Sequence, residues 1–178
     1  MRNKIMRLAM VVGIAVLLGA CASPARKAAL VVDDASFGVN YPFSVQVTTS
    51  GGGATEDIGY TNISNEDLAA AIEESITKSG LFEKIVHGDT ADYRLNVALV
   101  SMSKPMFGLT FKIDMEMAWS LVNKATGEAV MRESIVSTHS ATFSDAAVAV
   151  TRIKLAIEGA AQQNIRLGLR KIAGLQLR

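Results

Sequence analysis

The sequence predicts an α+β domain in which an antiparallel sheet of four to five strands carries two helices on one face. Several segments alternate apolar and polar residues with a period of two, which is typical of strands with one wet face. Two longer segments instead repeat apolar residues at intervals of three and four, which indicates amphipathic helices. The predicted order of elements is β-α-β-β-β-β-α, with the two helices covering the apolar face of the sheet.

Residues 1–20 are expected to be a signal peptide. Three basic residues come first, and residues 8–20 are uncharged. A helix needs about 20 apolar residues to cross a hydrocarbon core, so this shorter run has the length of the apolar region of a signal peptide. The run ends in Leu18-Gly19-Ala20-Cys21, which resembles the lipobox that the lipoprotein signal peptidase cuts before cysteine.

Cys21 is therefore the predicted site of lipidation. Its thiol would accept a diacylglyceryl group, and the new amino group another acyl chain. One chain binds a membrane only marginally, whereas two or three hold a protein there. Ala22 stands where, in enterobacteria-like sorting, Asp retains a lipoprotein at the inner membrane. This resemblance implies the outer membrane, on its periplasmic face. The alternatives are an ordinary signal peptide cut elsewhere and an N-terminal anchor helix.

Residues 21–29 are expected to be the lipidated cysteine and a short tether, and residues 30–178 a single periplasmic domain. The domain is expected to open with a short strand at residues 30–32 and a longer one at residues 43–49, where Phe, Val and Val alternate with Ser, Gln and Thr. A flexible loop with three glycines follows from residue 50.

Local signals place the two helices. Ser64 with Asp67 three residues later has the form of a capping box, and Gly80 is a natural end for the helix that follows. Ser144-Asp145 is expected to cap the second helix, which runs to about residue 175.

The second helix is interrupted by Gly159 and Gly168. A bend or a close helix contact is therefore expected there.

Four strands are expected between the helices. Residues 84–87 form a short candidate, and residues 92–102 and 109–122 alternate apolar and polar side chains over longer stretches. Residues 123–127 are expected to be a hairpin loop that returns the chain as a strand over residues 129–138.

The charge of the mature chain argues against nucleic acid as a partner. The chain has 18 basic and 17 acidic residues, and the signal peptide removes three basic residues and no acidic one, which leaves a net charge of −2. No basic excess remains to replace phosphate counterions.

No catalytic centre, metal site or cofactor is expected. The chain has two histidines and a single cysteine, so no histidine-rich or cysteine-based metal site is available. His139, Ser144 and Asp145 are of catalytic type, but Ser144-Asp145 is better explained as a helix cap. The pair Asp33-Asp34 is expected to be a solvated turn.

The methionines leave two alternatives open. Core filling is the favoured interpretation, and an irregular groove that faces a lipid or a partner is the other. The connection at Met106-Phe107 is the candidate for an exposed contact loop. The clustered methionines are Met102, Met106, Met115, Met117 and Met131.

Over residues 43–175 the chain is similar, at the level of pattern, to a broad group of small envelope lipoproteins with two helices on an antiparallel sheet. The group includes the lipopolysaccharide-assembly lipoprotein, the penicillin-binding-protein-activator lipoproteins, the exopolysaccharide-export lipoproteins and the N-terminal domain of the periplasmic Tol protein. The residues that carry the resemblance are Ser79-Gly80-Leu81-Phe82, Ala91-Asp92-Tyr93-Arg94-Leu95, Trp119-Ser120-Leu121-Val122, Thr126-Gly127-Glu128, Ala156-Ile157-Glu158-Gly159-Ala160-Ala161 and Asn164-Ile165.

These motifs are structural and are shared by proteins with different partners, so no residue role carries over. Together with the anchor, they favour a non-enzymatic adaptor or assembly factor that docks an envelope protein. The alternative is a lipoprotein that binds or transfers a lipid or glycolipid.

Overall fold

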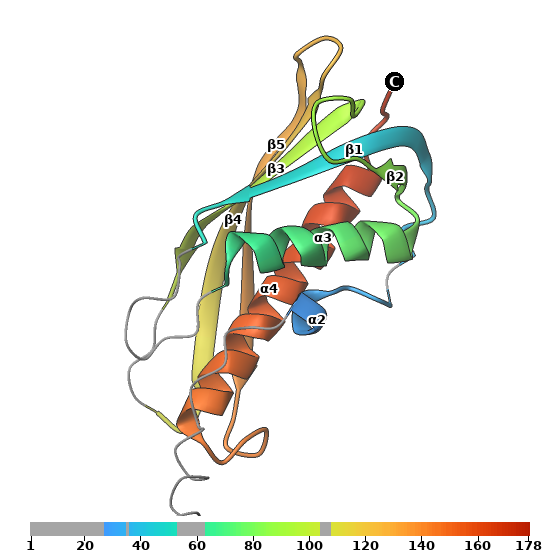
Figure 1. Ribbon diagram of the computed structural model, residues 1–178. Coiled ribbons are helices and arrows are strands. Elements are labelled where there is room, and N and C mark those ends of the chain that lie inside the picture. Colours follow the sequence, from blue (N-terminus) through green and yellow to red (C-terminus); the bar gives the residue numbers. More distant parts are fainter. Residues whose placement is uncertain (1–26, 35, 53–62, 104–107) are drawn as a thin grey trace, which may run out of the picture.

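The structure is a computed structural model that describes residues 27–34, 36–52, 63–103 and 108–178 (Figure 1). The signal peptide, Cys21, most of the tether and the Met106-Phe107 loop lie outside the described residues. The elements are α2 (Lys27–Leu30), β1 (Tyr41–Ser50), α3 (Asn65–Ser79), β2 (Phe82–Ile85), β3 (Tyr93–Met102), β4 (Phe111–Asn123), β5 (Ala129–Ala141) and α4 (Ala149–Ala173).

The predicted α+β class is confirmed, with α3 and α4 against the same face of the sheet (Figure 1). The strand order is β2-β1-β3-β4-β5. The sheet is mixed rather than antiparallel, because β1 runs parallel to both β2 and β3. A helix between two strands returns the chain to the end where it started, so β1-α3-β2 gives a parallel pair.

The alternation along β4 matches the prediction from the sequence. In β4 the side chains that face the helices are almost fully buried, while the opposite face is half-buried or exposed. This core row comprises Phe111, Ile113, Met115, Met117, Trp119 and Leu121. No helix among the described residues is long and apolar enough to cross a membrane.

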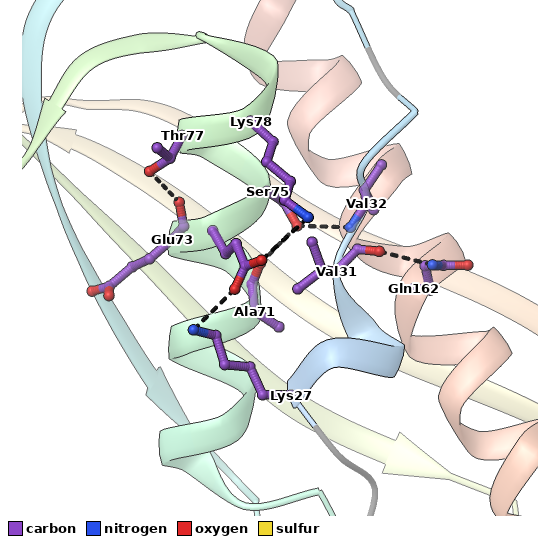
Figure 2. A network of polar contacts seen from close by, with 10 residues as sticks. Lys27, Val31, Val32, Ala71, Glu73, Ser75, Thr77, Lys78 and Gln162 are labelled. Carbon is purple, nitrogen blue, oxygen red and sulfur yellow. Dashed lines mark hydrogen bonds and ion pairs between the residues drawn. The ribbon is translucent and has the colours of Figure 1, made fainter.

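The segment expected as a strand at residues 30–32 is not one. Leu30 ends the short helix α2, and Val31 and Val32 follow as irregular buried backbone. Their backbone groups bond to side chains of neighbouring helices: Val32 N–H donates to Ser75 Oγ at 2.9 Å, and Gln162 Nε2 donates to the Val31 carbonyl at 2.8 Å (Figure 2). The apolar run is buried, and it packs between α3 and α4.

The two helix starts differ in how well the sequence predicts them. Ser64 caps α3 as expected, with its Oγ accepting from Asp67 N–H at 3.0 Å, and Gly80 ends α3 at φ 65°. Helix α4 begins at Ala149, with Val148 as its N-cap, and not at Ser144. The Asp145 carboxylate instead accepts from Thr142 N–H at 2.6 Å, so it closes a turn before the helix.

Helix α4 lies close against β4 and β5 at its two glycines, as the predicted close contact requires. A Cβ on Gly159 would come within 2.2 Å of the His139 ring, and a Cβ on Gly168 within 2.5 Å of the Trp119 ring. Real Cβ atoms do not approach so closely, so any other residue at either position would force the helix or the facing ring to move.

A buried polar network joins α4 to the sheet near Gly168. Asn164 accepts from Trp119 Nε1 at 3.0 Å and donates to the Ile135 carbonyl at 2.8 Å. Ser137 Oγ donates to the Ala160 carbonyl at 2.8 Å. Each buried polar group in this network has a partner, so burial carries little desolvation cost and fixes the position of the helix.

Candidate functional site

Exposed apolar side chains gather at the end of the sheet where β4 begins and β5 ends, since Phe111 pairs with Ala141 there. Leu109 is 73% exposed, Phe143 58%, Val148 62% and Val150 43%. These four residues, named the apolar end here, come from the β3–β4 connection, the β5–α4 connection and the first turn of α4 (Figure 1).

Most of the large hydrophobic side chains that are exposed in the described part of the chain lie at the apolar end. With Leu155 on the next turn of α4, this end carries five of the seven large hydrophobic side chains that are exposed in the described part of the chain. Single exposed apolar residues are ordinary, so it is their concentration at one end of the sheet that makes this end a candidate interaction surface.

The buried side chain of Arg152 packs against the apolar end. The side chain is 4% exposed, and its guanidinium lies 5.3 Å from the Phe111 ring centroid and 5.5 Å from that of Phe143. Its Nη1 donates to the carbonyls of Ala146 and Ala147 at 2.8 and 2.9 Å. Two aromatic faces and two carbonyls offset the cost of burying the charge, so Arg152 holds Phe143 and the β5–α4 connection in place.

A second surface is the sheet face that no helix covers. A shallow groove of about 470 Å³ crosses β3, β4 and β5 there, with small side chains on its floor. Its lining on this face comprises Asn96, Ala98, Ala118, Ser120, Arg132 and Ser134.

A row of charged side chains on β4, Lys112, Asp114 and Glu116, lies on the same sheet face and forms local pairs. Lys112 lies 3.3 Å from the Asp114 carboxylate, and Glu116 accepts from the Ser134 hydroxyl. A hydrogen bond from the Thr138 hydroxyl and the neighbouring Lys112 ammonium hold the pKa of Asp114 below its ordinary value.

His139, Ser144 and Asp145 do not form a catalytic arrangement. The His139 side chain on β5 packs against Gly159. Ser144 Oγ lies 2.8 Å from Thr142 Oγ1. The Asp145 carboxylate binds both the backbone and the hydroxyl of Thr142, and these bonds, with the charge of His139 as a lesser cause, lower its pKa. No hydrogen bond joins His139 to either residue within the described chain.

In the Asp33-Asp34 pair, Asp34 has a structural role. The Asp34 carboxylate pairs with Arg166 of α4 at 2.6 Å, and this bond lowers the pKa of Asp34. Across residues 27–34, 36–52, 63–103 and 108–178, no group of three or more metal-ligating side chains occurs.

The described methionines of the strands fill the core, as the favoured interpretation predicted. Met115 and Met117 are 0% exposed and Met131 is 6% exposed. Met102 is partly buried against the core. The alternative, a groove lined by these side chains, is wrong for Met115, Met117 and Met131. Met106 lies outside the described residues.

The sequence matches no family model and no curated protein, but the fold matches solved bacterial structures. A Xanthomonas campestris protein of the family DUF330 is 12% identical, with a TM-score of 0.55, over 76% of this chain and 88% of that chain. Uncharacterized lipoprotein B from Nitrosomonas europaea is 16% identical, with a TM-score of 0.51, over 75% and 84%.

A third structure, a single-residue variant of the PelC dodecamer from Paraburkholderia phytofirmans, is 14% identical to this chain. Its TM-score is 0.51, and the match covers 78% of this chain and 91% of that chain. At these identities, all three matches show a shared fold.

Proposed function

We propose that this protein is an envelope lipoprotein, held at the periplasmic face of the outer membrane by lipid on Cys21, and that its domain is a non-enzymatic adaptor. The sequence supports the anchor through the apolar run that ends in Leu18-Gly19-Ala20-Cys21. The fold shared with a Nitrosomonas europaea lipoprotein agrees with it.

The apolar end carries the adaptor part of the proposal. Leu109, Phe143, Val148 and Val150 come from separate segments yet expose their side chains at one end of the sheet. Such a surface favours a partner with an apolar patch of its own, because burying apolar area drives association. Arg152 adds rigidity, which lowers the conformational cost of docking.

The proposal that the domain is not an enzyme rests on the contacts of His139, Ser144 and Asp145, the candidate catalytic residues. Ser144 and Asp145 bond to Thr142 within their own turn, and the His139 ring lies against Gly159. A nucleophile and a base within hydrogen-bond reach would be needed for acyl transfer. These three side chains have other contacts instead.

The alternative of a lipid or glycolipid carrier has lost its main support. It depended on methionines that line a groove, and Met115 and Met117 are in the core. We therefore propose protein docking as the function.

Leu109→Ser with Val148→Ser tests the docking surface. Both side chains are exposed, so the double variant should fold normally but lose its partner. Cells carrying the tagged full chain would be cross-linked, and the covalent partners identified by mass spectrometry. Val100→Ser, a 57% exposed site on β3, is the matched control. We expect one envelope protein to be lost at least tenfold from the double variant alone. Equal recovery from all three chains would contradict the proposal.

A further inference from the structure

The two edges of the sheet are unequal. The edge strand β2 has four residues, whereas β5, at the other edge, has 13. An edge strand presents unpaired N–H and C=O groups, and natural proteins protect long edges with lysine, proline, bulges or a short length. Strand β5 contains neither Lys nor Pro, and its one register irregularity against β4 lies near its start, at Leu121/Val122. From Met131 to Ala141 the register with β4 is regular, and in the described part of the chain no strand pairs with the outer side of β5.

The middle of this edge is apolar on the uncovered side of the sheet. Val136 is 62% exposed, and its neighbours on that side, Ser134 and Thr138, are also exposed. On the helix side, Ile135 and Ser137 are buried beneath α4. An exposed β-branched residue between two small hydroxyl side chains is a suitable surface for another strand.

The sequence of β5 complements itself about Val136. If a second β5 ran antiparallel to the first with its Val136 opposite Val136, Ser134 would face Thr138, and Arg132 would face Ser140. On the helix side, Glu133 would face His139, which places a carboxylate opposite an imidazole twice, once on each side of the centre. Like charges face each other nowhere between positions 132 and 140 in this register.

We propose that the β5 edge binds a second copy of this chain, antiparallel and centred on Val136, and so joins two five-stranded sheets into one of ten strands. The interface is two-fold and closes on itself, because the same edge serves both copies. A second copy is the partner that fits this edge, because the order of side chains along β5 is self-complementary. The anchored chain would favour this pairing further, since copies held in one membrane surface meet at high effective concentration.

The first test is a disulfide across the proposed two-fold axis. Facing Cβ atoms in an antiparallel pair lie about 4.5–5.5 Å apart, so a cysteine in place of Val136 in each copy can be joined after a small adjustment. The full chain with Val136→Cys would be oxidised in intact cells with copper phenanthroline and run on a non-reducing gel. We expect most of the chain as a covalent dimer.

Two controls accompany this test. Val100→Cys is equally exposed on the same sheet face but lies on the inner strand β3, so it should stay monomeric. The wild-type chain carries only Cys21. A dimer of the wild type would reveal a free Cys21 thiol, which counts against the proposed lipid anchor and leaves the β5 interface unaffected. Equal cross-linking of Val136→Cys and Val100→Cys would overturn the interface.

The second test is specific to the register. Glu133→Cys and His139→Cys, co-expressed as chains with different tags, should give a mixed covalent dimer. Neither variant alone should, because residue 133 of one copy lies six residues from residue 133 of the other, about 20 Å along the strand. Homodimers of the single variants at the same yield would refute this pairing.

A third measurement does not depend on cysteine. Val136→Lys places a charge in the middle of the interface, and the exposed site should tolerate it in the folded monomer. In detergent, sedimentation should give a dimer for the wild type and for Val100→Lys, and a monomer for Val136→Lys. A monomeric wild type, or an assembly larger than a dimer, would reject the proposal.

Discussion

At the scale of single residues, the Asp92 carboxylate joins the start of β3 to β1. It accepts from Ser44 N–H at 2.7 Å and from Ser44 Oγ–H at 2.6 Å, while Asp92 N–H donates to Ser44 Oγ at 3.0 Å. The hydroxyl and amide of Ser44 are the main causes that lower the pKa of Asp92, with the Lys84 charge a smaller one. The charged form of Asp92 therefore contributes to stability.

The pH dependence of this contribution has a definite sign. The folded pKa lies below the unfolded value of 3.8, so the contribution is complete above the unfolded pKa and is lost as the pH falls through the folded pKa. We expect Asp92→Asn to lower the free energy of unfolding at pH 7, and the difference from the wild type to shrink below about pH 4. Urea unfolding at pH 7 and at acidic pH measures this.

Asp33→Asn is the control for that measurement. Asp33 is exposed and makes no hydrogen bond or ion pair with any described residue, so its substitution should change stability little at either pH. A difference between Asp92→Asn and the wild type that stays constant with pH would show that shape, and not charge, is responsible.

Single residues also show where the sequence predicted the surface and where it did not. The Met106-Phe107 loop, predicted as an exposed contact, lies outside the described residues, and Leu109, predicted as the start of a strand, precedes β4 and is 73% exposed. Phe143 and Val148 were not singled out, because isolated apolar residues near a helix start look like core positions. Arg152 was missed as well, although a lone Arg in the apolar row of a helix signals a buried charge that needs local partners.

At the scale of elements, the close contact of α4 with the sheet depends on two glycines, Gly159 and Gly168, which have no side chain to hold the helix away. Gly168 lets the helix lie on the Trp119 ring, and the network through Asn164 holds it there. Glycine normally weakens a helix by about 1 kcal/mol relative to alanine. Its presence in the middle of α4 is explained by this close approach.

Gly168→Ala should therefore destabilise the domain despite the better helix propensity of alanine. Overpacking costs about 1–3 kcal/mol, so a net loss of up to about 2 kcal/mol is expected after the propensity gain of about 1 kcal/mol. Trp119 is the single tryptophan of the chain, and its fluorescence during urea unfolding reports both the stability and the displaced contact.

Gly174→Ala is the matched control for that substitution. Gly174 has φ −82°, and the nearest atom to an added Cβ is 3.5 Å away, an ordinary contact. We expect a change smaller than about 0.5 kcal/mol. Equal effects at positions 168 and 174 would mean that Trp119 does not limit the approach of α4.

At the scale of the whole molecule, the proposed anchor places the domain close to a membrane. Six residue steps separate Cys21 from Lys27, where α2 begins, and a chain of that length spans at most about 20 Å. Lys27 is held to the domain by an ion pair with Glu74 of α3 at 2.9 Å (Figure 2). With lipid on Cys21, as proposed, the domain would stay close to the bilayer.

Cys21→Ser should release the chain from the membrane or leave it unprocessed. The serine hydroxyl cannot form the thioether, so the acyl chains that hold the protein are never added. Membrane fractionation with intact-mass measurement distinguishes the lipidated, cleaved and unprocessed forms. Ala22→Ser, one residue later, is the control and should stay lipidated. A Cys21→Ser chain that keeps both the membrane association and the mass of a lipidated protein would contradict the anchor.

The sequence by itself determined the local features of the fold. The alternation of β4, the capping of α3 by Ser64 and Gly80, and the core position of Met115 and Met117 were all predicted correctly. These features are local, because a strand's period of two and a cap's span of three residues lie within a short stretch of chain.

The tertiary structure alone decided which elements are neighbours. It made β1 parallel to β2 and β3, moved the start of α4 from Ser144 to Ala149, and packed the apolar residues after α2 between α3 and α4. It also gathered the apolar end from three segments and left β5 at an open edge. The alternation of apolar and polar residues along a strand indicates only which side chains face the core. The partner strand, and the side chains that satisfy each backbone group, depend on contacts between residues far apart in the chain.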